Sequence, residues 1–253
     1  MPTSIFRELA LVQTREMFRD LKTLFLSVLY PFVILAIFMF VGAVTPKSPG
    51  GPNIQALSIA MTLFLCVGSF GFFGLAVPLV AMRERGTLRL LSTTPLRRAT
   101  LLASQVPGRA AVAAGQIVVI VAIGLGMGAV TLANVAMLLA ACLLGLVLFA
   151  SLGYLVGGRA PSSESTSTVT AIGLVVLMFA GGLVFPLSGL PAAVGAVARF
   201  LPTTYLGDML RHAALGTPAQ YAPLLGVGVV LAYAAVFAAI AVRTFRWDAG
   251  ERA

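Results

Sequence analysis

The chain has 253 residues, of which 59% are hydrophobic and 10% are charged, and its formal net charge is +9. Its mean hydropathy of +1.02 lies far outside the range of soluble globular domains, so the composition indicates a membrane protein. Five long stretches carry no charged residue, and they lie between residues 22 and 47, 47 and 83, 109 and 159, 164 and 199, and 211 and 243. Because a helix needs about 20 apolar residues to cross a bilayer, these stretches are long enough to hold membrane spans.

Residues 1–22 are expected to form a helix that lies along the membrane surface. On a helical wheel, apolar side chains such as Leu9 fall within an arc of about 120°, while charged ones such as Arg7 and Arg19 fall on the other side. This amphipathic pattern is typical of an interfacial helix. The alternative is a basic tail whose only role is to set the topology.

Six transmembrane helices are predicted downstream, in one domain that comprises residues 23–253. The expected spans are about 23–44, 56–82, 108–130, 134–157, 166–188 and 222–242. The uncharged run from 110 to 158 is too long for a single span, and Thr131 and Asn134 indicate a turn inside it. The predicted fold class is an all-α membrane protein with six transmembrane helices, an N-terminal interfacial helix and an external re-entrant helix pair.

The distribution of basic residues predicts the orientation in the membrane. With six spans both termini lie on one side, and the segments assigned to that side carry 14 of the 17 Lys and Arg residues. Only Lys47, Arg199 and Arg211 fall in loops assigned to the other side. The positive-inside rule therefore places both termini in the cytoplasm and the protein in the cell membrane. The net charge is then a topology signal and requires no nucleic acid partner.

A charged hairpin, residues 83–107, joins the second and third predicted spans. Its first 16 residues read RERGTLRLLSTTPLRR and hold five of the 17 Lys and Arg residues. Gly86 relieves the backbone where the second span must turn, and Thr87 is placed to cap the short helix that follows. Thr94 and Pro95 then end that helix, because the residue before a proline disfavours the helical region.

The short helix of the hairpin has one apolar face. Leu88 and Leu91 lie one turn apart on it, a spacing suited to an apolar groove on a partner. A rigid element of this kind is placed to transmit force from a soluble protein into the second and third spans. The alternative is an ordinary basic loop that only holds the topology.

The segment 189–216, before the last predicted span, is unusual for a loop. Prolines stand at its borders, yet its middle, LPAAVGAVARFL, is apolar and too short to span a membrane. We expect two short helices, near 191–200 and 203–215, that dip into the outer leaflet. Asp208 and Arg211 stand three residues apart on the second helix and are expected to form a local ion pair, the alternative being contact with a substrate.

Two pairs of glycines in the predicted spans have the small-xxx-small spacing that lets helices approach closely. They are Gly124 with Gly128, and Gly153 with Gly157. The alternative is a chance spacing, because the chain has 26 glycines.

Motifs for enzymatic chemistry are missing from the sequence. His212 is the only histidine, so one chain cannot build a site with two histidine ligands. Neither lysine, Lys22 or Lys47, follows a glycine, so the Gly-Lys-Ser/Thr of a P-loop is absent and this chain is not expected to be an enzyme. All eight Asp and Glu residues fall outside the predicted spans, which argues against an ion-coupled carrier.

Two motifs resemble those of type-2 ABC exporter permeases, the family of daunorubicin-resistance and other drug-efflux membrane subunits. In the hairpin the matching positions are Glu84, Arg85, Gly86, Thr87, Leu91, Thr94 and Pro95. In the segment before the last span, FPLSGLP and LPTTYLGDMLRHAALG resemble the family's external segment, with Pro202, Thr204, Tyr205 and Arg211 at recurring positions. Arg89 and Gln105 stand where the family often has an acidic residue and a lysine, which bears on which ATPase docks here.

The resemblance implies the membrane subunit of an ATP-driven exporter. Two separate ATP-binding cassette ATPase subunits would bind ATP and magnesium and dock on the hairpin, so this chain would hold no cofactor and no metal of its own. A second permease copy or a sister permease would complete the path through the membrane lipid. The apolar lining favours an amphipathic or lipophilic substrate such as a drug, an antibiotic or a lipid.

The resemblance also implies where the functional residues lie. Coupling to the ATPase is expected at Glu84, Arg85, Gly86, Thr87, Leu88, Leu91, Thr94 and Pro95, and an external gate at Pro186, Pro202, Tyr205, Asp208 and Arg211. Two other classes of function stay open at this point. One is an ATP-independent channel or carrier, and the other is an intramembrane enzyme or an assembly factor.

Overall fold

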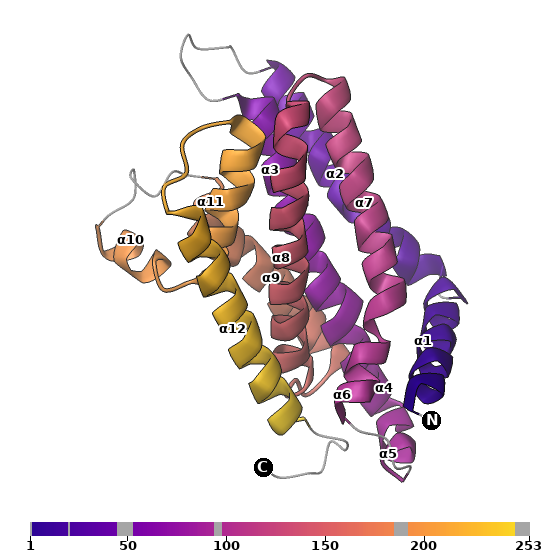
Figure 1. Cartoon of the computed structure of the whole chain (residues 1–253). Helices are drawn as coiled ribbons and strands as arrows, with labels where there is room; N and C mark the ends of the chain where they lie inside the picture. Colours follow the sequence, from indigo (N-terminus) through magenta and orange to yellow (C-terminus); the bar gives the residue numbers. More distant parts are fainter. Residues whose placement is uncertain (1, 20, 45–52, 94–97, 185–191, 246–253) are drawn as a thin grey trace.

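The computed structural model describes residues 2–19, 21–44, 53–93, 98–184 and 192–245 (Figure 1). Its helices are α1 (Pro2–Arg19), α2 (Leu21–Val44), α3 (Ile54–Ser69), the π-helix η1 (Phe70–Ala76), α4 (Val77–Glu84), α5 (Thr87–Ser92), α6 (Arg98–Ser104), α7 (Val106–Gly126), α8 (Leu132–Gly157), α9 (Ser163–Ala180), α10 (Ala192–Ala198), α11 (Pro202–Leu215) and α12 (Pro223–Arg243). The described part of the chain contains no strand. The fold is that of an all-α membrane protein, as the composition predicts.

Five helical stretches of the described chain are long and apolar enough to cross a membrane. They are Ile54–Glu84, Arg98–Gly126, Leu132–Gly157, Ser163–Ala180 and Pro223–Arg243, and Val28–Val44 within α2 is a shorter apolar helix. Each overlaps one of the expected spans, but α9 ends at Ala180 and does not reach residue 188. The reason is local, because Gly182 has a φ of 70°, a left-handed conformation that ends helices and that glycine adopts readily.

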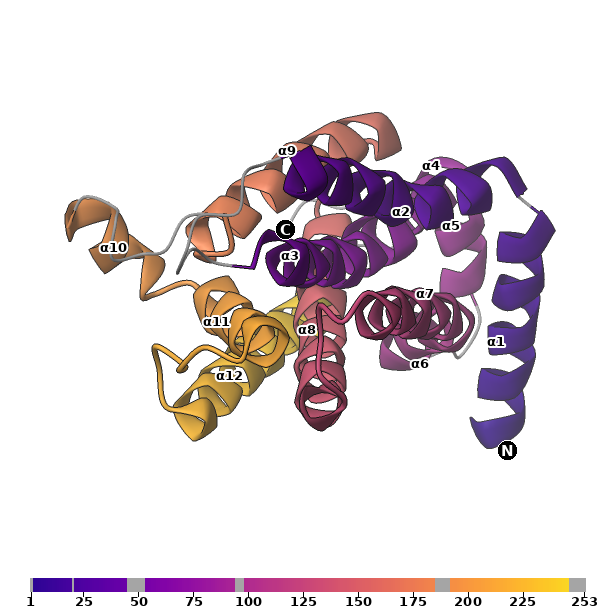
Figure 2. The same cartoon turned by 90° about the horizontal axis from the view of Figure 1, so that it is seen from above.

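The stretch Ile54–Glu84 forms the centre of the bundle. Within an apolar segment of 18 residues in this stretch, 78% is buried, whereas the corresponding value for the other four stretches is 22–39%. Figure 2 shows α3 in the middle, with α2, α7, α8, α9 and α11 arranged around it, and all five contact it. The outer helices expose large apolar side chains, as expected of surfaces that meet lipid.

A π-helix interrupts this central stretch. At the end of η1 the N–H of Val77 bonds to the carbonyl of Phe72, five residues back. Gly71 and Gly74 have low helical propensity. Pro78 has no N–H, so it cannot donate the hydrogen bond that a regular α-helix makes to the carbonyl four residues before it. This change in winding is not among the features expected from the sequence.

Helices α8 and η1 approach each other so closely that only glycine fits. A Cβ on Gly153 would lie 2.0 Å from the carbonyl oxygen of Gly71, and one on Gly157 would lie 2.9 Å from the Cα of Ala76. The small-xxx-small interpretation is therefore correct for Gly153 and Gly157. It is wrong for the other pair, because Gly128 lies in the turn after α7, with a φ of 67° and open space around it.

The N-terminal helix lies across the bundle and does not run along it. In Figure 2, which looks down on the bundle, α1 is seen along its length while α3, α7 and α8 are foreshortened. It packs on α6 and α7. We call the end of the bundle where α1, α5 and α6 lie the hairpin end (Figure 1). The buried Gln13 of α1 donates from Nε2 to the hydroxyl of Ser104 in α6 (3.2 Å).

The short helices α10 and α11 lie within about two residues of the expected ranges 191–200 and 203–215. Helix α11 packs against α3, α8 and α12, whereas α10 stands at the side of the bundle (Figure 1). Gly216, with a φ of 67°, ends α11. That this pair dips into the outer leaflet stays a prediction.

The close approach of α8 and η1 predicts a sharp difference between two glycine-to-alanine changes. Gly153→Ala should lower the free energy of unfolding by about 1–3 kcal/mol or more, because backbone must move to admit the Cβ. Gly173→Ala on α9 is the matched control, since open space surrounds it, and it should be neutral or slightly stabilising. Melting temperatures of both variants in the same detergent measure this, and equal values would contradict the packing.

Candidate functional site

The hairpin between the central stretch and α7 is built on a left-handed glycine. Gly86 has a φ of 73° and separates α4 from α5, so the expectation of a glycine-dependent turn here is confirmed. The expected helix cap is wrong, because Gly86 is itself the N-cap residue of α5 and no side chain caps that helix. Thr87 is instead the first residue of α5. Thr94 and Pro95 lie outside the described residues.

The apolar face of α5 turns into the chain. Leu88 is fully buried, in the same cluster as Leu79 of α4 and Leu101 of α6, and Leu91 packs against that cluster. The sequence predicts that Leu88 and Leu91 face a partner, but the chain itself covers Leu88 fully and Leu91 partly, and both fasten the hairpin to the bundle. Leu90 is the apolar residue of α5 that faces outward, with 72% of its surface exposed.

Two consecutive residues at the end of α4 hold the turn between α8 and α9. The guanidinium of Arg83 donates to the carbonyls of Gly157, Gly158 and Ala160, at 2.9–3.1 Å. These carbonyls end α8 and the turn after it, where helical carbonyls have no partner within the helix. A cation at this end also opposes the negative end of the helix dipole.

The neighbouring Glu84 binds the start of α9. Its carboxylate accepts from the backbone N–H of Ser163 (2.8 Å) and from the Ser163 hydroxyl (2.6 Å). An anion at a helix N-terminus satisfies free N–H groups and the positive end of the dipole. Arg83 and Glu84 thus hold the two ends of one turn, and we call them the Arg83–Glu84 clamp.

Helix α1 is joined to the same region. Arg85 lies 3.6 Å from the carboxylate of Glu16, and both side chains are more than half exposed. An exposed ion pair of this kind contributes little to stability, about 0–1 kcal/mol. Its value here is positional, since it places the amphipathic helix beside the hairpin.

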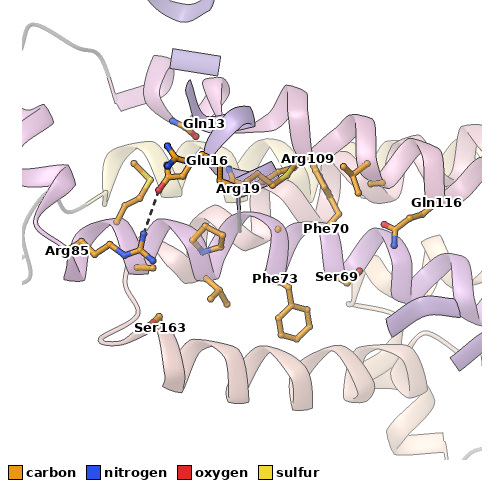
Figure 3. Close-up of a pocket in the computed structure, with 18 residues that line it drawn as sticks. Gln13, Glu16, Arg19, Ser69, Phe70, Phe73, Arg85, Arg109, Gln116 and Ser163 are labelled. Carbon is orange, nitrogen blue, oxygen red and sulfur yellow. Dashed lines mark ion pairs between the residues drawn. The ribbon is translucent and has the colours of Figure 1, made fainter. Parts of the chain in front are cut away.

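A cavity of about 680 Å3 lies between α1, the stretch from α3 to α4, and α7. Its apolar wall includes Phe70 and Phe73 of η1, and its polar lining comes largely from α1 and α7. Figure 3 shows charged side chains of three elements around this space, namely Glu16, Arg19, Arg85 and Arg109. Both the π-helix and the start of the hairpin therefore border the same cavity.

The expected gate residues lie on or near α11. Their side chains make different contacts from those predicted. Asp208 accepts from the backbone N–H groups of Gln220 (3.1 Å) and Tyr221 (3.0 Å), and Arg211 donates to the carbonyl of Gly182 (3.2 Å). The predicted ion pair between Asp208 and Arg211 is therefore wrong. Each side chain instead holds a different connection, one before α12 and one after α9.

The remaining gate residues are placed as follows. Pro202 is buried at the first turn of α11, and the ring of Tyr205 lies 4.8 Å from that of Tyr221 between centroids. The hydroxyl of Tyr205 donates to the carbonyl of Arg199 (3.0 Å). Pro186 lies outside the described residues. Four of the five expected gate residues thus gather around α11.

Sequence reasoning missed the residues that carry most polar contacts at the hairpin end. Arg83 and Arg109 were counted only as basic residues of a loop, yet Arg83 is 9% exposed and Arg109 lines the cavity. The signal for Arg83 was its place directly after an uncharged span, where a charge must find a protein partner or snorkel. Gln13 falls within the apolar arc of α1, and a polar residue that interrupts an apolar face is the signal that could have found it.

The clamp predicts that Arg83 contributes to stability, whereas Arg159, an exposed arginine in the turn that the clamp holds, does not. Arg83→Met should lower the free energy of unfolding by about 2 kcal/mol, because three carbonyls lose a charged donor. Arg83→Lys should restore part of the loss, since an ammonium has three donors but cannot reach them as a planar fork. Arg159→Met is the control, because Arg159 is exposed in the same turn. A melting temperature for Arg83→Met equal to that of the control would contradict the clamp.

Comparisons with known proteins agree with this architecture. A family model described as ABC-2 family transporter protein matches residues 44–243. Nodulation protein J from Rhizobium leguminosarum bv. viciae is 35% identical over 88 residues, 35% of this chain and 34% of that protein. Nodulation protein J from Rhizobium meliloti (strain 1021) is also 35% identical over 88 residues, 35% of this chain and 33% of that protein. The chain thus spans about a third of the length of the curated relatives it matches. Since the family model covers well over half of it, the chain belongs to the ABC-2 family of transporter proteins and is a multi-pass membrane protein.

Proposed function

We propose that this chain is the permease subunit of an ATP-driven exporter. The observation that carries the proposal is the construction of the hairpin end. There a short outward-facing helix, α5, is fastened to the bundle through Leu88 and leads directly into the central stretch through Gly86. Family membership supports an ATP-binding cassette ATPase as the partner, with ATP and magnesium bound on that partner and not on this chain.

The clamp supports a route for force through the bundle. A push on α5 reaches α4 directly, because only Arg85 and Gly86 separate the two helices. From α4 it reaches the turn between α8 and α9, because Arg83 and Glu84 bind that turn from both sides. Three spans then move together, and the coupling residues are Glu84, Arg85, Gly86 and Thr87, with Thr94 and Pro95 following in the hairpin.

Leu88 and Leu91 take an internal role in this proposal. They fasten α5 so that a force on its outer surface is not lost in a loose loop. Leu90 then becomes the apolar contact with the ATPase, because it is exposed on the same helix. An exposed apolar side chain that enters a groove on a partner is a common anchor of such interfaces.

The orientation follows from where arginines gather. The arginines of α1, the hairpin and the turn after α8 lie at the hairpin end, which we place in the cytoplasm together with both termini. Helix α11, with Pro202, Tyr205, Asp208 and Arg211, then lies toward the exit. Because Asp208 and Arg211 hold the connections on either side of α11, we propose that they position an external gate.

The substrate is proposed to be amphipathic or lipophilic. The bundle exposes large apolar side chains on α2, α7, α8, α9 and α12, and some of this surface is available to a second permease copy. A path between two such apolar surfaces accepts molecules that partition into the membrane more readily than highly charged ones. Drugs, antibiotics and lipids share this chemistry.

The role of α5 is tested by one exposed leucine. Leu90→Asn should reduce co-purification of the ATPase subunit about ten-fold, the effect of about 1.4 kcal/mol at an interface, with an unchanged melting temperature. Leu132→Asn is the matched control, because Leu132 is 79% exposed and is the first residue of α8. Gly86→Val should also impair coupling, since it strains a backbone with a φ of 73°. If both hairpin variants co-purify with the ATPase and export at the wild-type level, the coupling role of the hairpin is wrong. The hairpin would then be a basic loop that only holds the topology.

The orientation is tested by labelling single cysteines in a background without Cys66 and Cys142. An impermeant thiol reagent should label Pro218→Cys in intact cells and should label Ser92→Cys only after the membrane is opened. Both positions are exposed, so accessibility of the side chain does not decide the result. Labelling in the opposite order would place the hairpin end outside and would remove the basis for ATPase docking there.

A further inference from the structure

The cavity between α1, η1 and α7 has a composition that the coupling of the hairpin does not explain. It holds about 680 Å3, within the range of about 300–1,000 Å3 that is usual for ligand sites. One wall is apolar and comes from the central stretch, with Phe70, Phe73 and Val77. Most of the polar lining residues come from α1 and α7 (Figure 3). A ligand that fits both sides must itself be amphipathic.

The charge around the cavity is unbalanced. Arg19, Arg85 and Arg109 line it, with Glu16 as the carboxylate among the lining residues, and Glu16 pairs with Arg85. Arg19 makes no hydrogen bond or ion pair within the described residues. Arg109 donates only from Nη1, to the carbonyl and the side-chain oxygen of Gln105, and its other N–H groups have no partner in the described chain. These free donors favour an anion.

An acceptor is also left without a partner. Gln13 is 7% exposed and lines the cavity, and its Oε1 has no hydrogen bond among the described residues. Its Nε2 is already bonded to Ser104. Because a buried polar atom without a partner is costly, a ligand that donates a hydrogen bond here would remove the penalty. A phosphate diester alone cannot do this, but a headgroup with hydroxyls can.

We propose that this cavity is a binding site for an anionic phospholipid with a hydroxylated headgroup, such as phosphatidylglycerol. The phosphate binds the free donors of Arg19 and Arg109, a headgroup hydroxyl donates to Gln13, and the acyl chains lie along Phe70 and Phe73 of the central stretch. Arginine is suited to phosphate because its planar fork binds two oxygens at once.

A membrane lipid fits the site better than a soluble anion for two reasons. The apolar wall is part of a membrane-spanning stretch, so it lies at a depth where acyl chains are present. The basic side lies at the hairpin end, where the amphipathic helix α1 meets the bundle, and basic pockets between membrane helices are typical sites for anionic headgroups. The proposal does not depend on which substrate the protein exports.

The experiment compares lipids on the purified full chain after removal of bound lipid in detergent. Phosphatidylglycerol should raise the melting temperature, whereas phosphatidylcholine and inorganic phosphate should not. Phosphatidylmethanol, a diester anion of the same charge without the headgroup hydroxyls, should stabilise less than phosphatidylglycerol. Native mass spectrometry should detect retained phosphatidylglycerol on the wild-type protein before lipid removal.

The matched variants lie one turn apart on α1. Arg19→Gln should weaken phosphatidylglycerol binding about ten-fold, the effect of losing one charge-assisted contact. Arg15→Gln should bind as the wild type does, because Arg15 is exposed but does not line the cavity. Since Arg19 is exposed and makes no bond within the described chain, its replacement should not impair folding.

Three results would overturn the proposal. One is equal stabilisation by phosphatidylcholine, which would indicate general solvation by lipid. Another is equal stabilisation by inorganic phosphate, which would indicate a soluble anion. The third is equal binding by Arg19→Gln and Arg15→Gln. None of these results bears on ATPase docking, which the variants of Leu90 and Gly86 test separately.

Discussion

The interaction on which the hairpin end depends is the binding of one helical turn by two adjacent side chains of opposite charge. Arg83 occupies the carbonyl end of α8, and Glu84 occupies the amide end of α9. Both helix ends meet in a short turn, where the last carbonyls of a helix have no partner within the helix itself. By satisfying them from α4, the chain makes the central stretch and the helix pair α8–α9 into one unit. Removal of Arg83 leaves three carbonyls after α8 without this donor, and removal of Glu84 leaves Ser163 without this acceptor.

Close backbone contact extends the same unit through the membrane. Gly153 and Gly157 bring α8 against η1 at distances that exclude a Cβ, so the two helices cannot slide past each other without steric conflict. Without a hydrophobic driving force between helices in lipid, such packing supplies much of their association. The π-helix lies at this contact and also borders the cavity. Irregular winding of this kind is frequent at functional sites, because it re-aims side chains within a rigid helix.

The sequence predicts where the long helices lie, but it does not predict which groups their side chains contact. Uncharged runs and turn residues predicted every long helix, because hydrophobic length alone decides whether a segment spans. Gly86 was predictable for the same kind of reason, as its turn depends on local backbone freedom. The face of α5 was not predictable. Leu88 is an apolar residue in a charged loop, and only the three-dimensional structure shows that Leu79 and Leu101 cover it. The contacts of Asp208 and Arg211 were not predictable either. Their spacing allows an ion pair with each other, but nearby backbone groups bind both side chains instead.

The arginines at the hairpin end show how one property serves several purposes. Any basic residue satisfies the positive-inside rule, so topology alone does not require Arg83 to be buried or Arg109 to line a cavity. What sets these two apart is the chemistry of their surroundings. Arg83 lies among carbonyls, three of which accept hydrogen bonds from its Nη1 and Nη2 groups, so its role is structural. Arg109 lies beside an amide and an apolar wall, which leave most of its donors unused. Because a guanidinium keeps its charge in either setting, the unused donors distinguish a ligand site from a structural contact.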